Sequence, residues 1–130
     1  MSPRALRITF YTVLALLLVP NVLGGIGDLM RHPEIEANVT RLGYPAALLP
    51  LLGVARIGGA AAIAWSPWRD VRVAGYTGYV FFGLGAAYAH LSAGDAVVRA
   101  LPGLVFAALA VAGYLLWRRR EREAATTLPA

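Results

Sequence analysis

Four apolar segments, each about as long as the ~20 residues that a helix needs to cross a bilayer, occupy most of the chain. They run over residues 6–30, 45–64, 71–91 and 96–117. Lipid offers no partner to backbone N–H and C=O groups, so segments of this length and composition are expected to be helices. The sequence therefore predicts an all-α fold, a four-helix transmembrane bundle formed by a single domain over 1–130.

The composition narrows the class of protein. Of the 130 residues, 58% are hydrophobic and 15% are charged, which leaves little material for a separate soluble domain. The net charge of +5 comes from arginines at the ends of the apolar segments, without the basic stripe and interleaved aromatics of a nucleic-acid site. We expect no nucleic-acid partner. The chain has no cysteine, so its own side chains supply no disulfide, thiolate ligand or thiol redox chemistry.

The regions outside the four segments are short. The first segment begins like a secretory signal peptide, but it is long for one and lacks a clean cleavage site, so we expect it to be retained. Between the first two segments, Ile35, Val39 and Leu42 recur at helical spacing, which predicts a short amphipathic helix on the membrane surface. The polar tail over 118–130 is predicted to be disordered.

Arginines are distributed unequally between the two ends of the predicted spans. If successive spans alternate in direction, eight arginines fall at the end that holds both termini: Arg4, Arg7, Arg69, Arg72, Arg118, Arg119, Arg120 and Arg122. Three fall at the other end: Arg31, Arg41 and Arg99. The positive-inside rule then predicts that both termini are cytoplasmic. Tryptophans at the same end are predicted to anchor the helices at the interface: Trp65, Trp68 and Trp117.

Arg56 lies near the middle of the second segment, where a charged side chain is costly and marks a functional candidate. Several of its neighbours on the same helical face are small: Gly53, Gly59 and Ala60. Small residues are typical of a face along which helices approach closely, so Arg56 is expected to point into the bundle. The rise of ~1.5 Å per residue puts Asn21 level with Arg56 and Asp28 nearer the outer end.

Further polar residues fall at the same outer end of the bundle: Tyr88, His90 and Asp95. Together with Arg56, Asn21 and Asp28 they form a predicted ligand-binding pocket that opens to the outer side. Two interpretations of Arg56 stay open. It donates a hydrogen bond to a quinone or a small anion, with Tyr88 or His90 as proton donor. Alternatively, it is a structural lock that pairs with Asn21, Asp28 or a tyrosine to fix the register of the helices.

The sequence assigns no catalytic residue. It contains no nucleophile paired with a base, no phosphate-binding loop and no mid-span histidine pair for a haem, so whether the chain is an enzyme stays open. Only His32 and Asp28 show the spacing of four residues that helical metal ligands often have. We therefore expect no metal site.

Two runs of residues resemble the DoxX-like family of small bacterial integral membrane proteins. The first covers residues 41–59 and contains Arg56, and the second covers residues 83–95 and is followed by Leu101-Pro102. The resemblance implies a four-helix transmembrane bundle in the bacterial inner membrane, with Arg56 matching a basic residue of the second span. It also implies a Tyr-x-His turn, here Tyr88 and His90. Members often carry lysine where this chain has Asp28.

The resemblance implies two roles for the chain. Some DoxX-like proteins are linked to a thiosulfate:quinone oxidoreductase and to membrane redox complexes, which implies an accessory subunit with a quinone as its ligand. More distant relatives are similar to assembly factors, which implies a non-enzymatic membrane scaffold. The expected partners are the lipid bilayer, a membrane or redox protein, and a second copy of the chain packed through its glycine faces.

Overall fold

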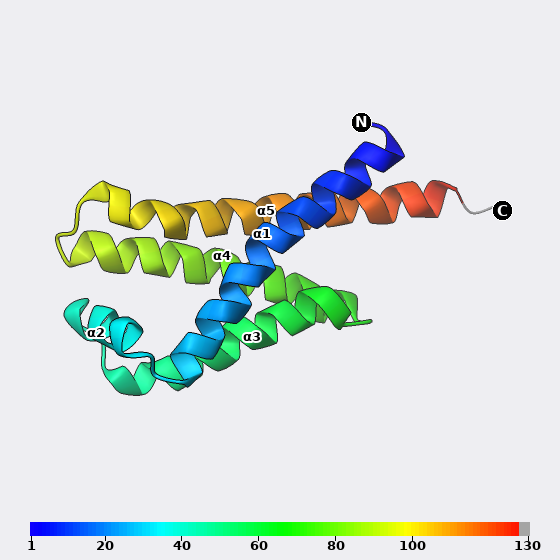
Figure 1. The fold of residues 1–130 in the computed structure, drawn as a ribbon. Helices are drawn as coiled ribbons and strands as arrows, with labels where there is room; N and C mark the ends of the chain where they lie inside the picture. Colours follow the sequence, from blue (N-terminus) through cyan, green and yellow to red (C-terminus); the bar gives the residue numbers. More distant parts are fainter. Residues whose placement is uncertain (128–130) are drawn as a thin grey trace.

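The computed structural model describes residues 1–127 and is helical, with no strand in that range (Figure 1). The helices are α1 (Pro3–Leu29), α2 (Pro33–Arg41), η1 (Ala46–Leu48), α3 (Leu49–Trp65), α4 (Arg69–Ser92) and α5 (Val97–Thr126), where η1 is a short 3-10 turn that leads into α3. The predicted all-α fold is confirmed. The four predicted apolar segments correspond to α1, to η1 with α3, to α4 and to α5.

Each of the four long helices packs extensively against two others. The helix α1 contacts α3 and α5, and α4 also contacts α3 and α5. Figure 1 shows α4 and α5 side by side along their length, with α1 crossing them obliquely and α2 at the end away from the termini. The core between the helices contains side chains from all four: Phe10, Leu17, Ala60, Ile63, Tyr76, Tyr79, Ala110 and Trp117.

Glycines permit the closest approaches between these helices. A Cβ atom added at Gly53 on α3 would lie 2.8 Å from the carbonyl oxygen of Gly25 on α1. On α5, a Cβ atom at Gly103 would lie 2.9 Å from the backbone nitrogen of Ala87 on α4. Real Cβ atoms do not fit at such distances, so both positions need glycine for the backbones to meet.

Within residues 1–127, three helical segments are long and apolar enough to cross a membrane: α1, Ala46–Trp65 and α5. The helix α4 has 24 residues but is less apolar, because it is rich in glycine and tyrosine and begins with Arg69, Asp70 and Arg72. Length and composition therefore support three spans directly, and the fourth stays a prediction.

The structure contains the predicted short helix between the first and second apolar segments. The α2 helix begins with Pro33 in its first turn, and His32 Nδ1 accepts a hydrogen bond from the Glu34 backbone N–H at 3.4 Å. It ends before Gly43, whose φ of 92° lies in the left-handed region that favours glycine. No residue of α2 is fully buried, and its apolar side chains Ile35 and Val39 face a cavity described below.

Both ends of the described chain lie at one end of the molecule (Figure 1). There the Arg120 guanidinium of α5 lies 4.5 Å from the ring centroid of Phe10 on α1. Arg69 at the start of α4 pairs with Glu121 of α5 at 3.6 Å. Arg4 and Arg7 of α1 border the same surface hollow as Arg120, so the structure gathers arginines from three helices at the end where the sequence placed them.

The prediction for Trp117 as an interface anchor is wrong. Its side chain is buried, with 5% of the residue exposed, and it stacks on Tyr76 with ring centroids 6.0 Å apart. Trp65 and Trp68 are exposed, at 79% and 70%. The α5 helix turns Trp117 toward α4, a rotation that the position of a residue along its span does not determine.

The predicted disorder of the tail 118–130 is also wrong for most of its length, because α5 continues to Thr126. The segment is rich in arginine, glutamate and alanine, which are strong helix formers. Arg119 and Glu123 also pair at 3.2 Å with a spacing of four residues, which supports the last turns. Residues 128–130 lie outside the described residues.

Candidate functional site

Arg56 lies in the middle of α3, and its side chain is only 16% exposed. Its Nη1 donates to Asp28 Oδ2 at 3.2 Å, and its Nε donates to Asn21 Oδ1 at 3.3 Å. Its Nη2 donates to the Pro20 carbonyl oxygen at 3.3 Å. All three acceptors belong to α1, so the structure brings Arg56, Asn21 and Asp28 together at the depth that the helical rise predicts.

The face of α1 is shaped to receive the guanidinium group. Asn21, Gly24 and Asp28 recur at helical spacing, and both polar residues are buried, with 1% and 3% exposed. A Cβ atom added at Gly24 would overlap three atoms of the Arg56 guanidinium. The Asn21 Nδ2 donates to the Leu17 carbonyl at 2.8 Å, which turns its Oδ1 toward Arg56. The glycine supplies the space, and the polar residues supply the acceptors.

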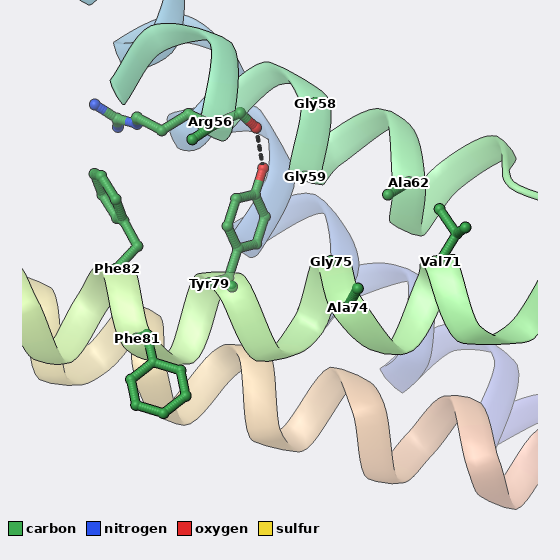
Figure 2. Close-up of a pocket in the computed structure, with 12 residues that line it drawn as sticks. Arg56, Gly58, Gly59, Ala62, Val71, Ala74, Gly75, Tyr79, Phe81 and Phe82 are labelled. Atoms are coloured by element: carbon green, nitrogen blue, oxygen red, sulfur yellow. Dashed lines mark hydrogen bonds between the residues drawn. The ribbon is translucent and has the colours of Figure 1, made fainter. Parts of the chain in front are cut away.

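Two aromatic residues of α4 complete the surroundings of Arg56. The Phe82 ring centroid lies 5.1 Å from Arg56 Cζ, and Figure 2 shows the ring below the guanidinium. The Tyr79 hydroxyl donates to the Arg56 carbonyl oxygen (Figure 2). Arg56 thus connects α1, α3 and α4. The sequence analysis missed Phe82, although an aromatic residue level with a buried cation is a signal for a cation–π contact.

A cavity of about 390 Å³ lies between α2, α3 and α4, and we call it the outer cavity. Arg56 and Asp28 border it, so the charged pair lies at its edge. The α2 helix covers it with Ile35 and Val39. Most of the remaining lining is apolar: Leu42, Leu48, Leu52, Phe82, Gly85, Ala86 and Ala89. This combination of apolar walls with a few polar groups is typical of small-molecule sites.

A second polar cluster holds α2 in place over the outer cavity. Arg41 at the end of α2 binds Asp95 with two hydrogen bonds, Nη1 to Oδ1 at 2.8 Å and Nη2 to Oδ2 at 3.0 Å. His90 Nδ1 lies 2.6 Å from Asp95 Oδ2, and His90 also lines the outer cavity. The hydrogen bond from Arg41, followed by that of His90, holds the pKa of Asp95 well below its ordinary value. The same bond with Asp95 raises the pKa of Arg41.

Comparison with known proteins adds the family. A model of the DoxX-like family matches residues 12–113, which is most of the chain and includes Asn21, Asp28, Arg56 and His90. The chain belongs to the DoxX-like family. No curated protein and no solved structure matches it. Membership of the DoxX-like family, together with the three long apolar helices, indicates a membrane protein.

The structure of this DoxX-like protein does not bring Tyr88 to the predicted pocket. Tyr88 is 68% exposed. It does not line the outer cavity, and no hydrogen bond joins it to Arg56. On α4 the cavity is lined by Phe82, Gly85, Ala86 and Ala89. Each helical residue turns by about 100°, so Tyr88 falls about 200° away from Ala86 and points outward.

Asp95 of this DoxX-like protein takes a different place from the one expected, whereas His90 borders the predicted pocket. Asp95 binds Arg41 and His90 and does not contact Arg56, so it belongs to the cluster that holds α2. His90 borders the outer cavity together with Arg56 and Asp28. Within residues 1–127, no three or more His, Asp or Glu side chains are grouped closely enough to hold a metal ion.

Proposed function

We propose that this DoxX-like protein binds a quinone in the outer cavity and acts as an accessory to membrane redox chemistry. One observation carries the proposal. Arginine has five N–H donors, and three of those on Arg56 bind α1, which leaves two without a hydrogen-bond acceptor among residues 1–127 on a side chain that lines an apolar cavity. A quinone carbonyl accepts such a hydrogen bond, and a quinone ring suits apolar walls.

The charge of the cavity favours a neutral ligand over a small anion. Asp28 lies 3.2 Å from Arg56 and borders the same cavity, so its carboxylate offsets the positive charge of the guanidinium. An anion bound by Arg56 would also be repelled by Asp28. A quinone meets the unused donors without adding charge.

His90 is the residue that we propose for proton exchange with the bound quinone. It lines the outer cavity, and its Nδ1 contacts the Asp95 carboxylate at 2.6 Å, which orients the ring. A partner membrane redox protein supplies or receives the electrons in this proposal. The chain itself then binds and positions the ligand as an accessory subunit.

The proposed setting is the bacterial inner membrane, with four spans and both termini in the cytoplasm. The support for α4 as a span is its 24-residue length and its packing between α3 and α5. The orientation is supported by the positions of Arg69 of α4 and Arg120 of α5, which lie at the same end of the molecule as both termini. Arginine-rich ends of membrane helices are usually cytoplasmic. The outer cavity then opens on the opposite, periplasmic side.

A second candidate function is a non-enzymatic scaffold or assembly factor in which Arg56 is a structural lock. The three hydrogen bonds from Arg56 to α1 favour it, because they tie α3 to α1 without any ligand. In that case the protein binds a membrane protein partner or a second copy through its glycine-lined helix faces.

The test compares the melting temperature of the purified protein with and without a short quinone, 2,3-dimethoxy-5-methyl-1,4-benzoquinone. Ligand binding raises the melting temperature of the native state. The informative variant is Gly85→Leu, because Gly85 lines the outer cavity and a Cβ atom there meets nothing within 4 Å. It fills the cavity and leaves the bonds of Arg56 in place.

We expect the quinone to stabilise the wild type and to have little effect on a folded Gly85→Leu protein. A wild type that no concentration of quinone stabilises contradicts the quinone proposal. If in addition Arg56→Leu melts at a much lower temperature, Arg56 acts as the lock of the scaffold.

A further inference from the structure

We infer that the ligand of the outer cavity carries a long apolar tail, and that this tail lies in a groove between α3 and α4. The inference rests on the proposed function and extends it to a class of quinone. The groove encloses about 620 Å³. Figure 2 shows it between the two helices, with Arg56 and Phe82 at one end and Val71 toward the other.

The groove has an apolar lining of small residues that suits a hydrocarbon chain. Its walls are mostly glycine and alanine, and on α3 it extends from Ala55 to Ala62, about 10 Å at ~1.5 Å per residue. A Cβ atom at Gly58 of α3 or at Gly78 of α4 meets nothing within 4 Å, so the groove has free space beside both of its walls. At its floor α3 and α4 meet, where a Cβ atom at Gly59 would lie 2.9 Å from Tyr79 Cε1.

The groove and the outer cavity meet at two residues. Among residues 1–127, only Arg56 and Phe82 line both spaces. The Arg56 guanidinium reaches toward Asp28, while the Phe82 ring lies 5.1 Å from it on α4. The outer cavity and the groove therefore lie on either side of the Arg56–Phe82 contact, and the tail of a ligand bound by Arg56 would pass over that contact to reach the groove.

The distribution of polarity favours one amphipathic molecule over a second transmembrane helix. Arg56 is the only charged residue in the groove lining, and it lies at the end that joins the outer cavity. A quinone with a tail matches this order, with its head at the charged pair and its chain along the small residues.

The experiment compares two quinones that differ only in the tail. The probes are 2,3-dimethoxy-5-methyl-1,4-benzoquinone and its 6-decyl derivative, each titrated against protein in phosphatidylcholine–phosphatidylglycerol nanodiscs, with the melting temperature as readout. The groove variant is Gly78→Leu, and Gly58→Leu fills the opposite wall if the first variant does not fold. The matched control is Ala108→Leu, which adds a leucine at an exposed position of α5 outside both spaces.

We expect Gly78→Leu to weaken binding of the decyl quinone about fivefold, because the tail loses van der Waals contacts in the groove but stays in lipid. Binding of the tail-less quinone should stay at the wild-type level, and Ala108→Leu should bind both probes as the wild type does. Partition of the decyl quinone into lipid is the same for all variants, so it cancels in the comparison.

The inference is overturned if Gly78→Leu binds the decyl quinone as tightly as the wild type does. It is also overturned if Gly78→Leu weakens both quinones equally, or if it changes the oligomeric mass, since the groove then holds a second copy. A wild type that binds the tail-less quinone but gains nothing from the tail overturns the inference and leaves the proposed function intact. A wild type that binds neither probe contradicts both the inference and the proposed function.

Discussion

The Asp28 carboxylate of α1 lies 3.2 Å from the Arg56 guanidinium of α3, and the two side chains are 4% and 16% exposed. Each charge is removed from water and is compensated by the other. The ion pair therefore holds α1 and α3 together, whether or not a ligand is bound. Its contribution to the free energy of unfolding can be measured separately from ligand binding.

Loss of either charge should destabilise the protein strongly. We expect Asp28→Asn or Arg56→Gln to reduce the free energy of unfolding by about 3 kcal/mol, because each leaves a buried charge without its partner. The double variant should lose clearly less than the sum of the two single losses. Reversible unfolding in mixed detergent micelles, followed by circular dichroism, measures all three. Strict additivity would show that the two residues are not coupled.

Gly24→Ala should displace the Arg56 side chain. A methyl group at Gly24 overlaps the guanidinium, so the hydrogen bonds from Arg56 to α1 must lengthen or break. We expect a loss of about 2 kcal/mol in unfolding free energy, in the range of overpacking in a filled core. Gly58→Ala is the control, because a Cβ atom there meets nothing within 4 Å.

The same substitution in an Arg56→Leu background tests the cause. Leucine is too short to reach the space beside Gly24, so Gly24→Ala should cost little there. An equal cost in both backgrounds would assign the effect to the α1 helix itself and not to Arg56.

Two tyrosines on α4 should respond differently to removal of their hydroxyl groups. The Tyr79 hydroxyl donates to the Arg56 carbonyl, so Tyr79→Phe should cost about 1 kcal/mol. The buried Tyr76 hydroxyl has no hydrogen-bond partner among residues 1–127, so Tyr76→Phe should be neutral or slightly stabilising. Both residues are nearly fully buried, at 3% and 2% exposed. Melting temperatures of the two variants give the comparison, and equal losses would contradict it.

The contact between Arg41 and Asp95 should keep α2 over the outer cavity. We expect Asp95→Asn to raise the rate at which a maleimide labels Val39→Cys, because Val39 faces the cavity beneath α2. The chain has no cysteine of its own, so the introduced thiol is the only site of labelling. Thr40→Cys on the exposed side of α2 is the control and should label at the same rate with and without Asp95→Asn.

The contribution of Asp95 to stability should disappear in acid. Its pKa is lowered in the folded state by Arg41 first and by His90 second, so the contribution is present above the ordinary carboxyl pKa of 3.8 and is lost as the pH falls toward the lower folded value. Arg41, His90 and Arg99 are the charged or titratable groups that face it. The difference in melting temperature between Asp95 and Asp95→Asn proteins should be constant from pH 7 to about 5 and shrink below about 4.

Both proteins in this pH series carry His90→Gln, which removes the imidazole and keeps a hydrogen-bond donor next to Asp95. A difference that already changes between pH 7 and about 5 would contradict the assignment to Asp95.

The contacts of Arg56 with α1 were predictable because they depend only on helix geometry. The rise per residue sets the depth of Asn21 and Asp28, and small residues on the α3 face indicate the side that faces the bundle. The rotation of α4 was not predictable in this way. Tyr88 has the right depth but points outward, because the direction of a residue depends on how its helix packs against its neighbours.

The position of Asp95 shows the same limit for connecting segments. Its partner is Arg41 on α2, and the sequence contains no signal for where a surface helix lies over the bundle. The end of α5 was mispredicted for another reason. A polar tail was taken as disordered, while its arginines, glutamates and alanines are strong helix formers that extend α5 to Thr126.

The order of α1 and α3 along the chain also bears on how the protein enters the membrane. A helix with an arginine at its centre is inserted at a cost of about 2.5 kcal/mol for that residue. Asp28 is synthesised before Arg56, so its carboxylate is in place on α1 when α3 leaves the ribosome. The two helices can then enter the bilayer as a neutral hairpin, in which α1 acts as the insertion partner of α3.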